Sequence, residues 1–270
     1  MSKWLRSSIV GIGAVVLSTV AIQASDEWRG VGSSLTSLLG VSSSLCDAGA
    51  VPLQLGQQTV CVDQFEASPA PGCPETVTNS HLDTVANLSA SDCSAISQPD
   101  MLPWRFVSLS EAQQLCARSG KRLPTVAEWY RFALLLPEPE QCVIAATESK
   151  QTNSKSECTT PQGIADLVGN VWEWTDEVVT NGEYHGRQLP PSGYVEVVDN
   201  NGIVTRTTTT PLAIMGADYA NTAADGVYGV LRGGFFVGET DAGLYAQKLD
   251  ATLDLRTAGV GFRCVQDVQF

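Results

Sequence analysis

The sequence predicts an α+β fold with two helices, short antiparallel strands and much irregular structure. Two segments begin with a helix-capping box, Ser108-Leu109-Ser110-Glu111 and Thr125-Val126-Ala127-Glu128, and continue with apolar residues at helical spacing. Short runs rich in valine, threonine and aromatic residues, bounded by Gly, Asn and Pro, are typical of strands in hairpins. Between these segments lie long polar stretches without periodicity, which predict loops.

The composition suits one large domain behind a leader. The chain has 270 residues, of which 43% are hydrophobic, and a net charge of −13. That acidity repels a phosphate backbone, so we expect no nucleic-acid partner.

The N-terminus has the pattern of a secretory signal. Lys3 and Arg6 precede an apolar run over residues 9–22, and a small residue, Ala24, marks a cleavage position. We therefore expect a signal peptide over 1–25, a Ser/Gly-rich spacer over 26–45 and the domain over 46–270. The apolar run is shorter than the ~20 residues that span a bilayer. An uncleaved anchor is the alternative, and only then would the chain contact a membrane.

Eight cysteines fit this exported setting. Their number is even and no pair forms a C-x-x-C motif, which favours disulfides over metal ligation. We expect a secreted, periplasmic or cell-surface protein.

The elements follow in order along the chain. Each helix ends at a breaker, the first near Ser119 before Gly120 and the second at Pro137. The predicted hairpins pair 51–55 with 59–65 and 193–198 with 203–207, and further strands are predicted over 230–236 and 259–265. Residues 68–100, rich in Pro, Ser, Asn and Asp, predict one long irregular loop, which carries the glycosylation sequon Asn87-Leu88-Ser89.

The densest aromatic stretch is Gly169-Asn170-Val171-Trp172-Glu173-Trp174. On an extended chain Trp172 and Trp174 point to one side and Glu173 to the other. The two rings can fill a core, and the acid then needs a partner or a cation, because an unpaired buried carboxylate is costly.

Four ordered motifs resemble the formylglycine-generating enzyme (sulfatase-modifying factor) family. They are Lys121-Arg122-Leu123-Pro124-Thr125 with Glu128-Trp129, the Trp-Glu-Trp stretch, Leu231-Arg232-Gly233-Gly234 and Gly261-Phe262-Arg263-Cys264. The resemblance covers residues 46–265 and implies a decorated C-type lectin fold. It also implies a disulfide between Cys116 and Cys264. The hypothesis for the other six cysteines is pairing between sequence neighbours: Cys46–Cys61, Cys73–Cys93 and Cys142–Cys158.

The resemblance implies a calcium ion as the one plausible cofactor. The family's site corresponds here to Val168, Gly169, Val171 and Glu173, and oxygen ligands of this kind suit calcium. The alternative is that Glu173 pairs with an arginine such as Arg232 or Arg263.

The catalytic residues of the family are missing. Its oxidases bind copper through two cysteines, which fall here on Gly238 and Gly243. A soft metal needs soft ligands, so copper binding and formylglycine-generating activity are not expected. Iron-dependent relatives use histidines, and this chain has only His81 and His185, far apart in sequence.

The last third also resembles the variable proteins of diversity-generating retroelements, in which a segment between Leu-Arg-Gly-Gly and Gly-Phe-Arg-Cys binds ligands. That segment is residues 235–259 here, and its mixture of aromatic, acidic and hydroxyl side chains suits a recognition surface. The residues expected to contact a protein or glycan ligand are Phe235, Phe236, Val237, Glu239, Thr240, Asp241, Tyr245, Gln247, Lys248 and Asp250. An enzyme with an unrecognised site and a structural envelope protein are the alternatives.

Overall fold

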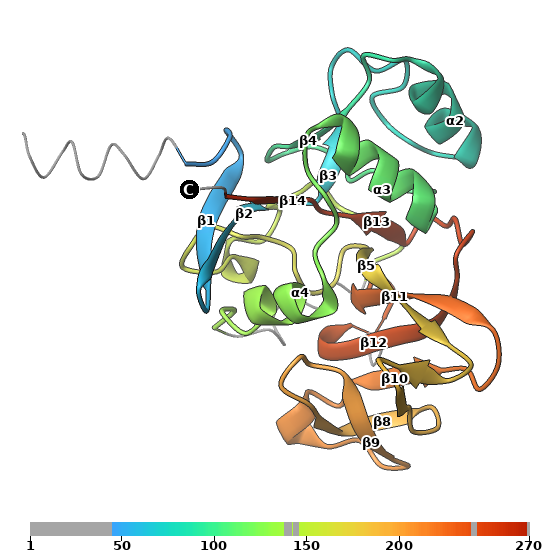
Figure 1. Ribbon diagram of the computed structural model, residues 1–270. Helices are drawn as coiled ribbons and strands as arrows, with labels where there is room; N and C mark the ends of the chain where they lie inside the picture. Colours follow the sequence, from blue (N-terminus) through green and yellow to red (C-terminus); the bar gives the residue numbers. More distant parts are fainter. Residues whose placement is uncertain (1–44, 138–141, 143–145, 239–241, 269–270) are drawn as a thin grey trace, which may run out of the picture. The chain divides into compact units, whose positions relative to one another are not determined.

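Strands gather into two larger sheets and one small one in a computed structural model of the chain (Figure 1). The structure describes residues 45–137, 142, 146–238 and 242–268. The predicted leader and nearly all of the spacer, together with Glu239, Thr240 and Asp241, lie outside the described residues. Residues 47–270 group into one unit, to which the following description applies.

The largest sheet has nine strands in the order β7-β6-β5-β11-β12-β10-β8-β9, with β13 pairing with β5. Most neighbours are antiparallel, but β10 runs parallel to β12 and β13 parallel to β5. The strands are β5 (Trp172–Thr180), β6 (Glu183–Tyr184), β7 (Arg187–Gln188), β8 (Gly193–Val198), β9 (Val204–Thr208), β10 (Tyr219–Thr222), β11 (Val227–Gly233), β12 (Gly243–Thr252) and β13 (Val260–Phe262). The predicted hairpin near residue 200 is therefore formed by β8 and β9.

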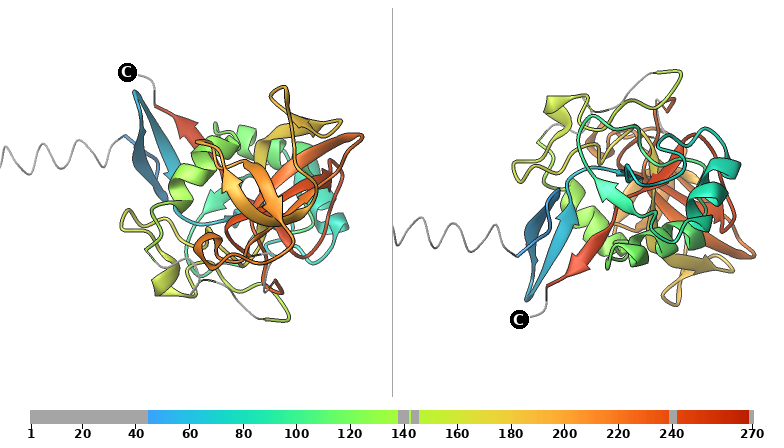
Figure 2. Two further views of the ribbon diagram at one scale, coloured as in Figure 1. Left: turned by 90° about the horizontal axis from the view of Figure 1, so that it is seen from below. Right: turned by 90° about the horizontal axis from the view of Figure 1, so that it is seen from above.

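The second sheet joins the two ends of the described chain. The predicted hairpin of β1 (Ala50–Leu55) and β2 (Gln58–Asp63) is confirmed, and β14 (Val265–Asp267) pairs with β2. Figures 1 and 2 show β14 beside this hairpin. A third sheet pairs β3 (Ala67–Pro69) with β4 (Ala95–Ser97).

Both predicted helices begin at their capping boxes. In α3 (Leu109–Arg118) the Ser108 side chain accepts from Glu111 N, and in α4 (Val126–Ala133) the Thr125 side chain accepts from Glu128 N. Both helices pack on β5. The α+β prediction is confirmed.

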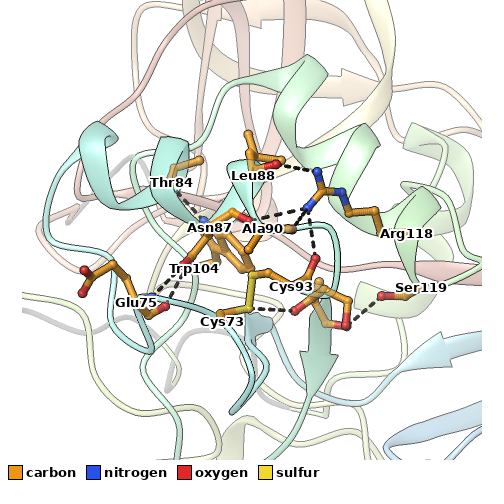
Figure 3. The surroundings of a disulfide bond; sticks show 12 residues. Cys73, Glu75, Thr84, Asn87, Leu88, Ala90, Cys93, Trp104, Arg118 and Ser119 are labelled. Atoms are coloured by element: carbon orange, nitrogen blue, oxygen red, sulfur yellow. Dashed lines mark hydrogen bonds between the residues drawn. A yellow bond between two sulfur atoms is a disulfide. The ribbon is translucent and has the colours of Figure 1, made fainter.

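The prediction of one irregular loop over 68–100 is wrong, because this stretch contains helix α2 (His81–Ser89). Its fully buried Asn87 side chain donates to Glu75 O and accepts from Glu75 N, as Figure 3 shows. Arg118 of α3 donates to the carbonyls of Leu88 and Ala90 at the C-terminal end of α2. Tertiary contacts thus stabilise a helix that the polar composition of this stretch does not predict. Asn87 is also inaccessible as a glycosylation acceptor in the folded chain.

The described part of the chain contains three of the predicted disulfides. Cys73–Cys93 closes the excursion that carries α2, Cys142–Cys158 closes a loop, and Cys116–Cys264 ties α3 to the end of the domain. Cys46 and Cys61 are also disulfide-bonded. Their mutual pairing stays a prediction. Among the described residues, none of the helices has the length and apolarity required to cross a bilayer.

Candidate ligand-binding surface and its buried support

The Trp-Glu-Trp stretch forms the start of β5 and faces both ways as predicted. Trp172 and Trp174 belong to one hydrophobic cluster, with 5% and 0% of their surface exposed. Trp174 Nε1 donates to Val107 O over 2.9 Å, so the buried indole keeps a partner. Glu173, also fully buried, points to the other side of the strand, toward Trp129 of α4 and Arg263.

Glu173 and Arg263 form a fully buried ion pair with well-satisfied hydrogen bonds. Arg263 Nη2 donates to Glu173 Oε1 over 2.6 Å, and its Nε lies 2.9 Å from both carboxylate oxygens. Trp129 Nε1 donates to Glu173 Oε2 over 2.7 Å. The remaining guanidinium donors reach the backbone carbonyls of Asp63, Gln64 and Ala165. One side chain from the end of the domain thus joins three distant segments.

Two further acids lie in the field of this pair. Burial is the main cause that raises the pKa of Asp166 to about 6 from the usual 3.8. The pKa of Glu66 is raised well above its usual range by burial and by the nearby charges of Asp166 and Glu173. Glu66 accepts from Asn170 Nδ2 and Val171 N. A single guanidinium therefore faces three buried acids, which favours a protonated Glu66.

The residues proposed for calcium do not fit that ion as they are arranged. Val168, Val171 and Glu173 are at most 1% exposed, and both Glu173 oxygens already accept from N–H donors. A cation there would also stand against the Arg263 guanidinium. Within the described residues, no three His, Cys, Asp or Glu side chains gather to hold a metal. The geometry favours the arginine alternative, and calcium binding stays a prediction to be tested.

The two glycines at the copper-ligand positions have different surroundings. Gly238 is buried, and its N–H donates to Phe235 O. A Cβ on Gly243 would lie only 1.9 Å from Asp218 Oδ1. Asp218 is buried and accepts from Tyr245 N over 2.6 Å. The Asp218 carboxylate thus fills the space that a Gly243 side chain would need, a contact between distant residues that no motif indicated.

The Arg-Gly-Gly motif places a second buried cation, Arg232, against the ring of Trp129. The Arg232 guanidinium lies 5.0 Å from the Trp129 ring centroid and donates to the Gly202 and Leu244 carbonyls, while its Nε has no partner in the structure. Burial lowers its pKa to about 10. Gly233 has a φ of +88°, and a Cβ there would meet Leu167 O at 2.4 Å. Glycine therefore permits the close approach of β11 to the segment before β5.

The predicted recognition segment becomes β12 and the turn before it. Val237 is 53% exposed and Phe235 is half-buried against the core. Lys248 and Asp250 form an ion pair of 2.8 Å, with side chains 29% and 30% exposed. Tyr245 is half-buried, with its ring centroid 6.3 Å from that of Tyr130. Tyr245, Lys248 and Asp250 reach the surface from β12 in the middle of the sheet, and Phe235 and Val237 from the turn after β11.

Two residues predicted to contact a ligand are buried instead. Gln247 is 0% exposed, and its side chain accepts from Val204 N and donates to Tyr245 O. Phe236 is 6% exposed, and its ring packs edge-on against Phe235. Both predictions are therefore corrected, because the strand and its turn direct these side chains inward.

The two histidines are held apart on different elements. His81 Nε2 lies 2.9 Å from Glu111 Oε1, and His185 Nε2 lies 3.1 Å from Glu177 Oε1. Their side chains are 41% and 67% exposed, His81 at the start of α2 and His185 in the turn between β6 and β7. The structure does not bring them together.

Comparisons with known proteins agree with the motifs. The family model described as "Sulfatase-modifying factor enzyme 1-like domain" matches residues 141–268. No curated protein matches the chain. Among solved structures, the chain is similar to the Major Tropism Determinant I1 variant at 15% identity and a TM-score of 0.42, covering 82% of this chain and 55% of that one. It therefore spans about half of that protein.

Two further structures are similar over most of their own length. One is Treponema denticola variable protein 1, at 14% identity and a TM-score of 0.44, covering 81% of this chain and 92% of that one. The other is CarF, at 13% identity and a TM-score of 0.41, covering 82% and 96%. The matched domain and the mixed architecture agree with the lectin-like fold that the motifs imply. Residues 141–268 are thus similar to the sulfatase-modifying factor enzyme 1-like domain, a match that covers slightly less than half of the chain.

Proposed function

We propose that this chain is an exported ligand-binding protein whose recognition surface lies in residues 235–259. The observation that carries the proposal is the position of Val237, Lys248 and Asp250. These side chains reach solvent, while their neighbours Ala246 and Leu249 are fully buried. Lys248 and Asp250 lie on β12, a strand fixed in a large sheet, which holds their side chains in place before binding and lowers the entropic cost of association.

The surroundings of this segment support a role in binding. Leu231-Arg232-Gly233 precedes it and Gly261-Phe262-Arg263 follows it, and both flanks are buried with internal partners. Side chains on the exposed part of the segment can change without touching those flanks. A scaffold of this kind can present different surfaces on one fold, which is the behaviour proposed for this protein.

Export is part of the proposal. It is supported by the disulfide-bonded state of the cysteines, because such bonds persist in oxidising compartments. The predicted signal sequence points the same way. Sequencing the N-terminus of the exported protein would test it, and a start near Asp26 is the expected result.

The test of binding is a screen of the mature chain against immobilised extracellular proteins and glycans. For any hit, Val237→Asp and Lys248→Ala should each weaken binding about tenfold, as expected for contacts within an interface. Lys150→Ala is the matched control, since Lys150 is an exposed lysine outside the segment. Hits that are insensitive to both changes, or no hit at all, would contradict the proposal.

Diversification of the segment is tested separately in the gene's surroundings. A near-copy of the codons for residues 235–262, differing mainly at adenines, beside a reverse transcriptase gene is the expected finding. If both are absent, the hypothesis that this segment is diversified is wrong, and the binding screen still tests whether the segment binds a ligand.

A further inference from the structure

The exposed side chains of β12 continue across two more strands. In the parallel pairing of β10 with β12, Asn221 stands opposite Lys248, and in the antiparallel pairing of β10 with β8, Tyr219 stands opposite Tyr194. Paired residues point to the same side of a sheet, and so do residues two apart on a strand. Together with Asp250, which is ion-paired to Lys248, these four residues form what we call the β8–β12 face.

The β8–β12 face is the outward side of this part of the sheet. Its five residues are all half-buried. The residues that alternate with them point the other way into a hydrophobic cluster: Val195, Ala220 and Leu249 are at most 1% exposed. At these five positions the sheet therefore has a core side and a partly open side, and the open side ends on β12 at Ala246, which is buried in another hydrophobic cluster.

The face offers hydrogen-bonding groups that the protein itself does not use. Within the described part of the chain, the hydroxyls of Tyr194 and Tyr219 make no hydrogen bond with another residue. The same is true of the Asn221 side-chain amide. The two rings meet edge to face at 5.3 Å and 84°, an arrangement that fixes their orientation. Free polar groups on fixed rings are ready to bind a ligand without first breaking internal contacts.

The charges of the face cancel, although the chain as a whole is strongly acidic. Lys248 and Asp250 neutralise each other across 2.8 Å, and the other three residues are neutral. The net charge of −13 disfavours an acidic partner. A strongly basic partner would gain more from the acids elsewhere on the surface. The chemistry that remains is a neutral ligand rich in hydroxyl groups.

We infer that the β8–β12 face binds a neutral glycan, an inference that rests on the proposed binding function. The tyrosine rings would stack on the C–H faces of sugar rings, because the face of an aromatic ring carries partial negative charge. The Asn221 amide and the Lys248–Asp250 pair would exchange hydrogen bonds with sugar hydroxyls.

The experiment applies the full mature chain to an array of neutral and acidic oligosaccharides, with an array of extracellular proteins in parallel. Tyr219→Phe removes one hydroxyl and Asn221→Ala one amide, and each should weaken binding to a neutral glycan about 2- to 10-fold, as for a lost neutral hydrogen bond. Tyr194→Ala should weaken it further, since it also removes a ring. Asn201→Ala, the same change at an exposed residue of the β8–β9 turn, should leave binding unchanged.

The outcomes separate this inference from the proposed function. Neutral-glycan binding that falls in the three variants and survives in the control supports both. Binding only to a protein or to acidic glycans, weakened by Lys248→Ala, overturns the glycan inference and keeps the proposed function. Neutral-glycan binding indifferent to Tyr194, Tyr219 and Asn221 overturns the assignment to this face. A chain that binds nothing on either array overturns both.

Discussion

Replacement of Glu173 by alanine should strongly destabilise the whole domain and not merely impair a site. Among the described residues, the change removes the one carboxylate that accepts hydrogen bonds from Arg263, whose guanidinium is fully buried. Breaking a buried ion pair from one side costs about 3–5 kcal/mol, because the remaining charge is left without compensation. Typical domains have only about 5–15 kcal/mol of unfolding free energy. The loss is therefore a large fraction of the total.

The contacts explain why the cost should be high at this position. Glu173 accepts four hydrogen bonds of 2.6–2.9 Å, three from Arg263 and one from Trp129 Nε1. Arg263 keeps its bonds to backbone carbonyls in the variant, so its charge cannot leave the interior without disrupting β2 and the segment before β5. The nearby Asp166 carboxylate offsets part of the charge, which places the estimate nearer 3 kcal/mol than 5.

Urea unfolding followed by far-UV circular dichroism, with disulfides intact, measures this cost. Glu173→Gln keeps the shape but removes the charge, and should fall between wild type and alanine. Glu183→Ala, at an exposed acid on β6, is the control and should stay within about 0.5 kcal/mol of wild type. A Glu173→Ala protein less than about 1 kcal/mol below wild type, or one that is stable but fails to bind, would refute the reasoning.

Three further predictions follow from the same interior. The Asp166 carboxyl binds its proton more tightly in the folded than in the unfolded chain, so the unfolding free energy should fall as pH rises from about 4 to about 6. In urea titrations at several pH values, Asp166→Asn should make this decrease smaller. An unchanged decrease would contradict the raised pKa of Asp166. Gly243→Cys should lower the melting temperature without binding copper, because the new side chain meets Asp218; a stable, copper-binding variant in metal analysis would show otherwise. Adding a chelator should leave the melting temperature unchanged, because Arg263 already pairs with Glu173. A clear drop in melting temperature that calcium reverses would show that the domain binds calcium.

Short sequence patterns predicted the elements that are stabilised by contacts between residues close in sequence. The Ser108 and Thr125 capping boxes located α3 and α4, and the alternation of Trp172, Glu173 and Trp174 placed rings and acid on the correct sides. Helix α2 was hidden because its support comes from Arg118 and from the Asn87 contacts with Glu75, which composition does not reveal.

The candidate surface was predicted only in part for a related reason. Strand β12 shows no clean alternation, because its register with β11 shifts and both sides are partly covered. The sequence therefore predicts that Gln247 is exposed like its neighbour Lys248, but its side chain is buried and hydrogen-bonded within the domain. The β8–β12 face depends on strands 25 or more residues apart, Tyr194 with Tyr219 and Asn221 with Lys248, and only the register of the folded sheet shows that they are adjacent.

The place of Arg263 in the chain also sets the order in which the domain can be completed. Its partner Glu173 is ninety residues upstream, β13 pairs with β5, and β14 pairs with β2 near the start of the domain. Until this last part of the chain has been synthesised, Glu173 lacks the Arg263 cation and β2 is paired only with β1. A growing chain thus stays open at its centre until almost its full length is available, a state compatible with passage through a membrane channel before folding.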